Sequence, residues 1–118
     1  MTDKIAICVF FTAALAACSP APHKMSAGEL AALKPADAHT AELYRHSCKA
    51  CHAMPGAGAP LVHDSTAWDP RWAKGEDVLL SHAVLGFQAM PAGGQCAACT
   101  AKDFQAIIRF MADRENGQ

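Results

Sequence analysis

The feature that most constrains this chain is the pentapeptide Cys48-Lys49-Ala50-Cys51-His52. Cys-x-x-Cys-His is the pattern by which a haem is attached covalently, because two thiols on one turn of chain can add to the two vinyl groups of a porphyrin. The imidazole that follows the second thiol is then held under the ring, where it can ligate iron as the proximal ligand. The motif therefore predicts one haem c, with Cys48 and Cys51 as thioether residues and His52 as an iron ligand.

Two other interpretations of the motif are a thioredoxin-like dithiol and half of a zinc site. A thioredoxin motif should follow a strand, yet residues 41–46 are helix formers with no β-branched run near them. A zinc ribbon would place its second cysteine pair roughly 15 to 20 residues further on. The second pair, Cys96 and Cys99, lies far outside that window, so both interpretations are disfavoured.

The N-terminus predicts export. An uninterrupted run of apolar and small residues covers 5–17 after Lys4, too short to span a bilayer as a helix, and it indicates a lipoprotein signal peptide over residues 1–17. The run ends in Leu15-Ala16-Ala17-Cys18, which resembles a bacterial lipobox, where the cysteine is lipidated and becomes the first mature residue. An ordinary cleavage site near Ala17 is the alternative. Lipidation of Cys18 would anchor the mature protein, because a diacylglyceryl group and an N-acyl chain give stable membrane attachment together.

The six cysteines can then be assigned. Cys8 leaves with the signal peptide, Cys18 takes lipid and the motif pair takes haem, so Cys96 and Cys99 remain. In an exported protein this pair is most simply a disulfide. Because its ring is small, chain entropy predicts only about 2 kcal/mol of stabilisation, and we expect the bond to shape a loop. A redox-active dithiol is the alternative, since Thr100 is a good N-cap and a helix N-terminus lowers a thiol pKa.

The rest of the sequence divides into a spacer and one domain. Residues 18–36 are rich in proline and alanine and predict a flexible spacer, in which only 26–33 could form a short helix, with Ser26 and Glu29 placed as a capping box. Residues 37–118 carry seven Lys or Arg and nine Asp or Glu, a formal charge of −2. This balance argues against nucleic acid as a partner.

The domain is expected to be helical throughout. Residues 37–49 predict a first helix that leads into the haem motif. Asp69-Pro70 predicts the start of a short helix ended by Gly75, and 76–86 predicts a third helix with one apolar face that continues to Phe87. The last helix is predicted to start after Thr100 and to end at Asn116-Gly117. Its buried stripe has the spacing i, i+3, i+4 and i+7, and consists of Phe104, Ile107, Ile108 and Met111.

A second axial ligand should lie well downstream of His52 and in a loop. Met90 meets both conditions, since Pro91 biases its backbone away from helix and Gly93-Gly94 allow the chain to turn beside the porphyrin. Methionine is more often a core filler than a ligand. The rival methionines fit less well: Met25 lies in the spacer, Met54 is too close to His52, and Met111 belongs to a helical stripe. His63 and His82 remain as alternatives that would give bis-His ligation.

At this point the chain resembles a known family. Four parts carry the resemblance: Tyr44 with the haem motif, Trp68-Asp69-Pro70-Arg71-Trp72-Ala73-Lys74-Gly75, Gly86-Phe87-Gln88-Ala89-Met90-Pro91-Ala92-Gly93-Gly94, and the Cys96/Cys99 pair. From about Thr40 to the end of the last helix, the sequence is similar to class I cytochrome c of the c5 type.

The resemblance implies an all-α class I cytochrome c fold of about four helices around one covalent haem. It makes His52 and Met90 the axial ligands, Cys48 and Cys51 the thioether residues, and Cys96–Cys99 a disulfide. Four aromatic residues would line the haem site: Tyr44, Trp68, Trp72 and Phe87. Arg71, Lys74 and Trp72 are candidate neighbours of the propionates, and a solvated basic patch is the alternative for the two cations.

The implied function is one-electron transfer in the periplasm by a carrier that is not an enzyme. The expected partners are the membrane, through Cys18, and redox proteins, namely a quinol-oxidising complex and a terminal oxidase or reductase. The alternative is a haem enzyme or gas sensor, such as a peroxidase, in which the sixth ligand is labile; no clear distal acid–base group supports it. A haem-free dithiol oxidoreductase is a third hypothesis.

Overall fold

The computed structural model describes residues 24–117, so the predicted signal peptide and the predicted lipidation site Cys18 lie outside the described residues. Between residues 24 and 117 there is no strand, and one isolated bridge pairs Phe87 with Met90. The helices are α1 (Ala27–Ala32), α2 (Ala38–His46), α3 (Lys49–His52), α4 (Ser65–Trp72), α5 (Glu76–Leu85), the 3₁₀ helix η1 (Ala92–Gln95) and α6 (Ala101–Met111). The all-α prediction is confirmed. None of the helices within this range is long and apolar enough to cross a membrane.

The first predicted helix is two helices. Asp37 caps α2 by accepting the Thr40 amide at 2.8 Å, as its sequence position allows. The helix ends at His46, three residues before the predicted boundary, because Ser47 leaves helical geometry at φ −128° and ψ −69°. The Ser47 hydroxyl donates to the Leu43 carbonyl at 2.6 Å, which satisfies one of the carbonyls at that end. The break turns the chain into α3, which carries the haem motif.

The predicted start at Asp69-Pro70 is wrong. Helix α4 begins five residues earlier, after Asp64, whose side chain accepts the Ala67 amide. Pro70 lies inside the helix, where it withholds the amide that would bond to the carbonyl of Thr66. Because Thr66 is exposed, water can take that carbonyl. The helix ends at Trp72, and Gly75 caps the next helix with φ +102°.

Helices α5 and α6 agree more closely with the sequence. The α5 boundaries are confirmed, but its buried face is narrower than expected, since Leu79 and Ala83 are buried while Val84 and Phe87 are exposed. Helix α6 begins after Thr100 in a capping box with Asp103. All four residues of its predicted stripe are buried.

The predicted end of α6 at Asn116-Gly117 is wrong. The helix stops at Met111, and Asp113 adopts a left-handed conformation with φ +57°. The His63 amide donates to the carbonyl of Met111 at 2.8 Å. This hydrogen bond attaches the loop before α4 to the C-terminal end of α6.

Helix α1 differs from the flexible spacer predicted over 18–36. Ser26 and Glu29 form the expected capping box, yet the helix is packed, because Leu30 is 1% exposed within the core. Met25 and Leu33 pack against the same cluster, so the packed part of the chain begins well before Asp37. A six-residue helix is not stable alone in water, so this burial accounts for its order.

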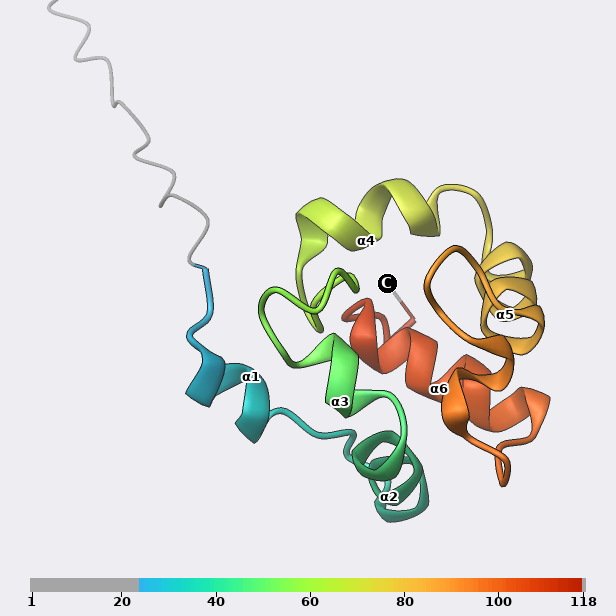
Figure 1. Ribbon diagram of the computed structural model, residues 1–118, viewed down its shortest axis with the longest axis horizontal. Coiled ribbons are helices and arrows are strands. Elements are labelled where there is room, and N and C mark those ends of the chain that lie inside the picture. The colour runs from blue at the N-terminus through green and yellow to red at the C-terminus, as the bar shows by residue number, and fades with distance from the viewer. Residues whose placement is uncertain (1–23, 118) are drawn as a thin grey trace, which may run out of the picture.

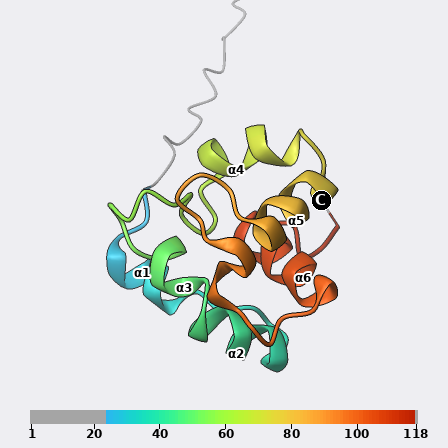
Figure 2. The same cartoon turned by 45° about the vertical axis from the view of Figure 1, so that its right-hand side comes forward.

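The helices surround α6. Helix α6 packs against both α2 and α5, while α3 and α5 lie on opposite sides of it (Figure 1). Helix α1 lies beside α3, at the end of the molecule away from α5, and both views agree on this placement (Figure 2). The core forms two neighbouring clusters, one around Tyr44, Trp68 and Phe110 and the other around Leu79, Phe104 and Ile108. The haem motif and the loop after α5 therefore face each other across a cavity that α6 also lines.

Candidate haem site

The two motif cysteines lie in different surroundings, and neither takes part in a disulfide. Cys48 caps α3 and is buried, whereas Cys51 is exposed. Burial raises the pKa of the Cys48 thiol, the opposite of what a nucleophilic dithiol requires. The Ser47 hydroxyl lies 3.4 Å from the Cys48 sulfur. This environment therefore does not support a thioredoxin-like dithiol.

His52 is held by the segment that follows the haem motif. The residue is 6% exposed, and its Nδ1 donates to the Pro60 carbonyl at 2.8 Å. The Val62 amide donates to the His52 carbonyl at 2.8 Å, and Trp68 Nε1 donates to the Leu61 carbonyl at 2.7 Å. Hydrogen bonds with Pro60 and Val62 therefore fix the ring and the backbone of His52, and Trp68 holds the residue between them.

This arrangement decides which nitrogen of His52 can bind a metal. Because Nδ1 carries the proton that it donates to Pro60, Nε2 keeps its lone pair. Burial lowers the pKa of His52, which favours the neutral imidazole that ligation requires. The Pro60 carbonyl was missed from the sequence, and no local pattern distinguishes it from other loop carbonyls.

A cavity opens between the haem motif, α4, α5 and α6. Its wall combines two thiols, an imidazole, a thioether and a largely apolar surface supplied by several helices. Among the residues that line it are Cys48, Cys51, His52, Trp68, Arg71, Leu79, His82, Ala83, Phe87, Met90, Phe104, Ile107, Ile108 and Met111. Residues far apart in the sequence thus meet at one site.

The structure brings most of the predicted site residues to this cavity, but not all. Tyr44 does not line it and packs instead against Phe110, with ring centroids 4.9 Å apart and nearly perpendicular planes, in the contact between α2 and α6. Trp72 faces a separate depression beside Arg109 and Arg114. Tyr44 is therefore part of the buried core and Trp72 is half-buried at its edge, so the structure places neither ring against the cavity. Of the three candidate propionate neighbours, Arg71 alone lines the cavity within residues 24–117.

The candidates for the sixth ligand are separated by their positions. Met90 lines the cavity from the loop after α5, whereas Met54 is 57% exposed and does not line it. His63 packs edge-on against Phe110, with ring centroids 5.1 Å apart, and also lies off the cavity. His82 does line it, and its ring stacks on Phe87 at 3.8 Å. Met111 reaches the cavity wall from the buried face of α6.

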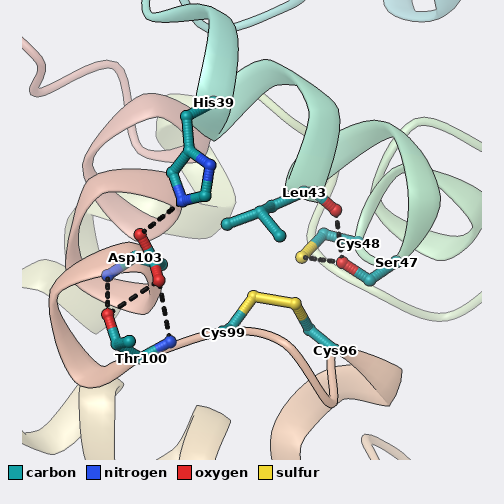
Figure 3. The surroundings of a disulfide bond; sticks show 8 residues. All are labelled: His39, Leu43, Ser47, Cys48, Cys96, Cys99, Thr100 and Asp103. Carbon is teal, nitrogen blue, oxygen red and sulfur yellow. Dashed lines mark hydrogen bonds and ion pairs between the residues drawn. A yellow bond between two sulfur atoms is a disulfide. The ribbon is translucent and has the colours of Figure 1, made fainter.

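Cys96 and Cys99 are joined by a disulfide, with Cα atoms 5.4 Å apart. Figure 3 shows the bond beside Leu43 of α2 and immediately before the N-terminus of α6, where Thr100 and Asp103 cap each other. Cys99 packs against both core clusters. The bond therefore closes the loop that connects the Met90 segment to α6.

The residues at the cavity fit a covalent haem. Two unpaired thiols lie at the spacing that thioether attachment needs, a neutral imidazole keeps Nε2 for iron, and the wall behind them is apolar. No cluster of three or more His, Cys, Asp or Glu side chains suited to a metal ion occurs among residues 24–117. The cysteine pair and the single imidazole at the cavity are the groups that a thioether-linked porphyrin and its iron would use.

Several known proteins are similar to this chain in sequence and in fold. The family model described as cytochrome c oxidase, cbb3-type, subunit III matches residues 35–111. Cytochrome c5 from Ectopseudomonas mendocina is 38% identical over 66 residues, which are 54% of this chain and 76% of that protein. The chain belongs to the class I c-type cytochromes.

Two solved structures extend the likeness to the fold. A cytochrome c solved in an electron transfer complex with nitrite reductase has a TM-score of 0.59 and 36% identity, covering 68% of this chain and 98% of that chain. A mono-haem ferrocytochrome c from Shewanella putrefaciens has a TM-score of 0.57 and 41% identity, covering 68% and 94%. The protein is accordingly a mono-haem electron-transfer cytochrome whose cofactor is one covalently bound haem c.

Proposed function

We propose that this cytochrome is a periplasmic one-electron carrier of a respiratory chain, anchored to a membrane through lipidated Cys18, with His52 and Met90 as the axial ligands. The observation that carries the proposal is that an imidazole and a thioether, from segments 38 residues apart in the sequence, line one cavity with the two cysteines of the haem motif. The cytochrome likeness supports electron transfer, and the signal-like N-terminus supports export.

The chain's own residues define how such a carrier works. The bound haem supplies an iron that accepts and releases one electron. His52 holds its ring by the bond to Pro60, so the nitrogen that faces iron is fixed. Met90 offers a soft thioether, which raises the reduction potential compared with a second histidine. The apolar residues of α5 and α6 exclude water, which disfavours the extra charge of ferric iron.

Redox proteins are the proposed partners. We expect a quinol-oxidising complex to supply the electron and a terminal oxidase or reductase to accept it. The complex of a similar cytochrome c with nitrite reductase supports a reductase as one acceptor class. Lipid attachment would keep the carrier near membrane donors and raise its effective concentration there.

The ligand set is tested by visible spectra of the oxidised and reduced holoprotein, followed by addition of carbon monoxide. We expect c-type reduced bands that carbon monoxide leaves unchanged, and an oxidised near-infrared band of methionine-ligated iron. Met90→Ala should abolish that band and admit carbon monoxide. Met54→Ala is the matched control, because that side chain is exposed and off the cavity. Carbon monoxide binding by the unaltered protein would instead support an enzyme or gas sensor.

The location is tested by fractionating cells that produce the full chain. The proposal predicts haem protein in the membrane fraction, released to the soluble periplasmic fraction by Cys18→Ser. Mass spectrometry of the purified protein should show a diacylglyceryl modification on Cys18. A mature chain that begins at residue 18 without lipid would refute the anchor and leave electron transfer untouched.

A further inference from the structure

The loop after α5 is closed by its own backbone. The Phe87 amide donates to the Met90 carbonyl at 3.0 Å, and the Met90 amide donates to the Phe87 carbonyl at 2.9 Å. These two bonds form the isolated antiparallel bridge, with Gln88 and Ala89 at its tip. Gln88 adopts a positive φ of +53°, which a tight two-residue turn of this kind requires. The protein therefore folds this turn with contacts of its own.

Gly86 is the position at which this turn meets the next stretch of backbone. A Cβ built on Gly86 would lie 2.9 Å from the Ala92 nitrogen and 3.1 Å from the Met90 carbonyl oxygen. It would also lie 3.3 Å from the Pro91 carbonyl carbon. All three atoms are backbone, so no side-chain rotation can relieve the contact. The absence of a side chain at residue 86 lets the chain cross itself beside Met90.

Other glycines of the chain share the positive φ of Gly86 but not its surroundings. Gly75, at the opposite end of α5, has φ +102° and nothing within 4 Å of its Cβ position. Gly93 has φ +71° and is equally open. Gly94 is close to the Met90 side chain only, at 3.1 Å from Cε. A left-handed φ alone therefore does not account for glycine at position 86.

We propose that residues 86–92 form a preformed frame that presents the Met90 thioether to iron, and that Gly86 is the positioning residue that holds the frame together. This inference rests on the proposed ligation by Met90. Gly86 contacts neither haem nor iron; it acts by allowing the backbone of Met90, Pro91 and Ala92 to pack against the end of α5. Any side chain at residue 86 must displace the backbone that carries the ligand.

The test compares Gly86→Ala with Gly75→Ala in the holoprotein. Both variants place a Cβ on a glycine of positive φ at an end of α5, so both carry the same kind of backbone strain, but only the first adds a collision. We expect Gly86→Ala to weaken the near-infrared methionine band and to bind exogenous imidazole about tenfold more tightly or better. Gly75→Ala should keep the band and the imidazole affinity of the unaltered protein. Equal behaviour of the two variants would overturn the proposal.

Hydrogen exchange of the unaltered protein tests whether residues 86–92 are preformed, even if Gly86→Ala yields no holoprotein. Imidazole at saturating concentration displaces the thioether from iron. A preformed frame predicts that the amides of Phe87 and Met90 stay protected, within about threefold, after this displacement. A large loss of protection at both amides would show that the iron bond holds the loop, and would refute the frame.

Failure of the ligand assignment would look different. If Met90→Ala leaves the near-infrared band and the carbon monoxide response unchanged, Met90 is not the ligand and the proposed function is wrong at that point. If Met90→Ala abolishes the band while Gly86→Ala preserves it, the ligand is correct and only the positioning role of Gly86 is refuted.

Discussion

Replacing Leu30 by alanine should lower the free energy of unfolding of the holoprotein by about 2 to 3 kcal/mol. Leu30 is 1% exposed and belongs to the same buried cluster as Val62 and Trp68, and a leucine removed from such a site usually costs about 2 to 5 kcal/mol. The expected value lies at the lower end because α1 has only six residues. The loss cannot exceed the free energy that holds α1 on the domain, since a weakened α1 detaches.

The measurement is guanidinium unfolding of the holoprotein followed by far-ultraviolet circular dichroism. Leu33→Ala is the matched control, because its side chain is only partly buried beside the same cluster, and it should cost about 1 kcal/mol. If α1 detaches in Leu30→Ala, the m-value should fall and the second substitution should add nothing to the first. A loss of less than about 1 kcal/mol for Leu30→Ala would refute the packed role of α1.

Three further predictions follow from single contacts. Tyr44→Phe should leave stability unchanged or raise it by about 1 kcal/mol in chemical unfolding, because the buried Tyr44 hydroxyl has no hydrogen-bond partner among the described residues. Trp68→Phe should lower the free energy of unfolding by about 1 kcal/mol more than its smaller side-chain volume accounts for, because it removes the donor to the Leu61 carbonyl. Chemical unfolding of the holoprotein measures this loss. Asp103 accepts hydrogen bonds from Thr100, and these bonds lower the pKa of the Asp103 carboxyl below its ordinary value of 3.8. The ionised carboxylate therefore stabilises the folded protein fully above pH 3.8, and this stabilisation is lost as the pH falls through the lowered pKa. Acid unfolding curves should therefore be shallower for Asp103→Asn, and a parallel curve would show that the cap contributes nothing.

The sequence predicted those elements whose signals are local and uncontested. The α6 stripe has four apolar residues at helical spacing and a strong cap at Thr100, and all four are buried as expected. The boundaries of α5 followed from acids in its first turn and the glycines at residues 75 and 86. The haem motif predicted the class of cofactor, because few chemistries require two thiols and an imidazole at that spacing.

The start of α4 and the packing of α1 could not be predicted from local sequence signals alone. Two aspartates, Asp64 and Asp69, could each begin α4, and the proline after the second is locally the more persuasive, yet the first wins because the earlier start lets Trp68 reach the core and the Leu61 carbonyl. Helix α1 could be anticipated from its capping box but its burial could not, since a single leucine on a six-residue helix carries no measurable periodicity.

The detail of the site was least accessible from the sequence. Whether an aromatic residue faces the cavity depends on how its segment is turned. The sequence offered Tyr44, Trp72 and Phe87 alike, and the structure has Phe87 but neither of the other two among the residues that line the cavity. The sequence offered His63 and His82 as equivalent candidates for the sixth ligand. Only the folded chain distinguishes them, since His82 lines the cavity and His63 does not. The close approach at Gly86 is a contact between backbone segments, which no side-chain pattern reports.

The docking of α1 beside α3 has a practical consequence for attaching this protein to surfaces. Because α1 is held at the end of the molecule away from α5, a linker joined ahead of Lys24 leaves from the α3 side (Figure 1). An electrode or bead coupled through such a linker would leave Val84, Leu85 and Phe87 at the opposite end accessible from solution. Coupling through Lys102, which is exposed in the first turn of α6, would present a different face. Comparing electron-transfer rates for the two attachments would show which end of the cytochrome admits the electron.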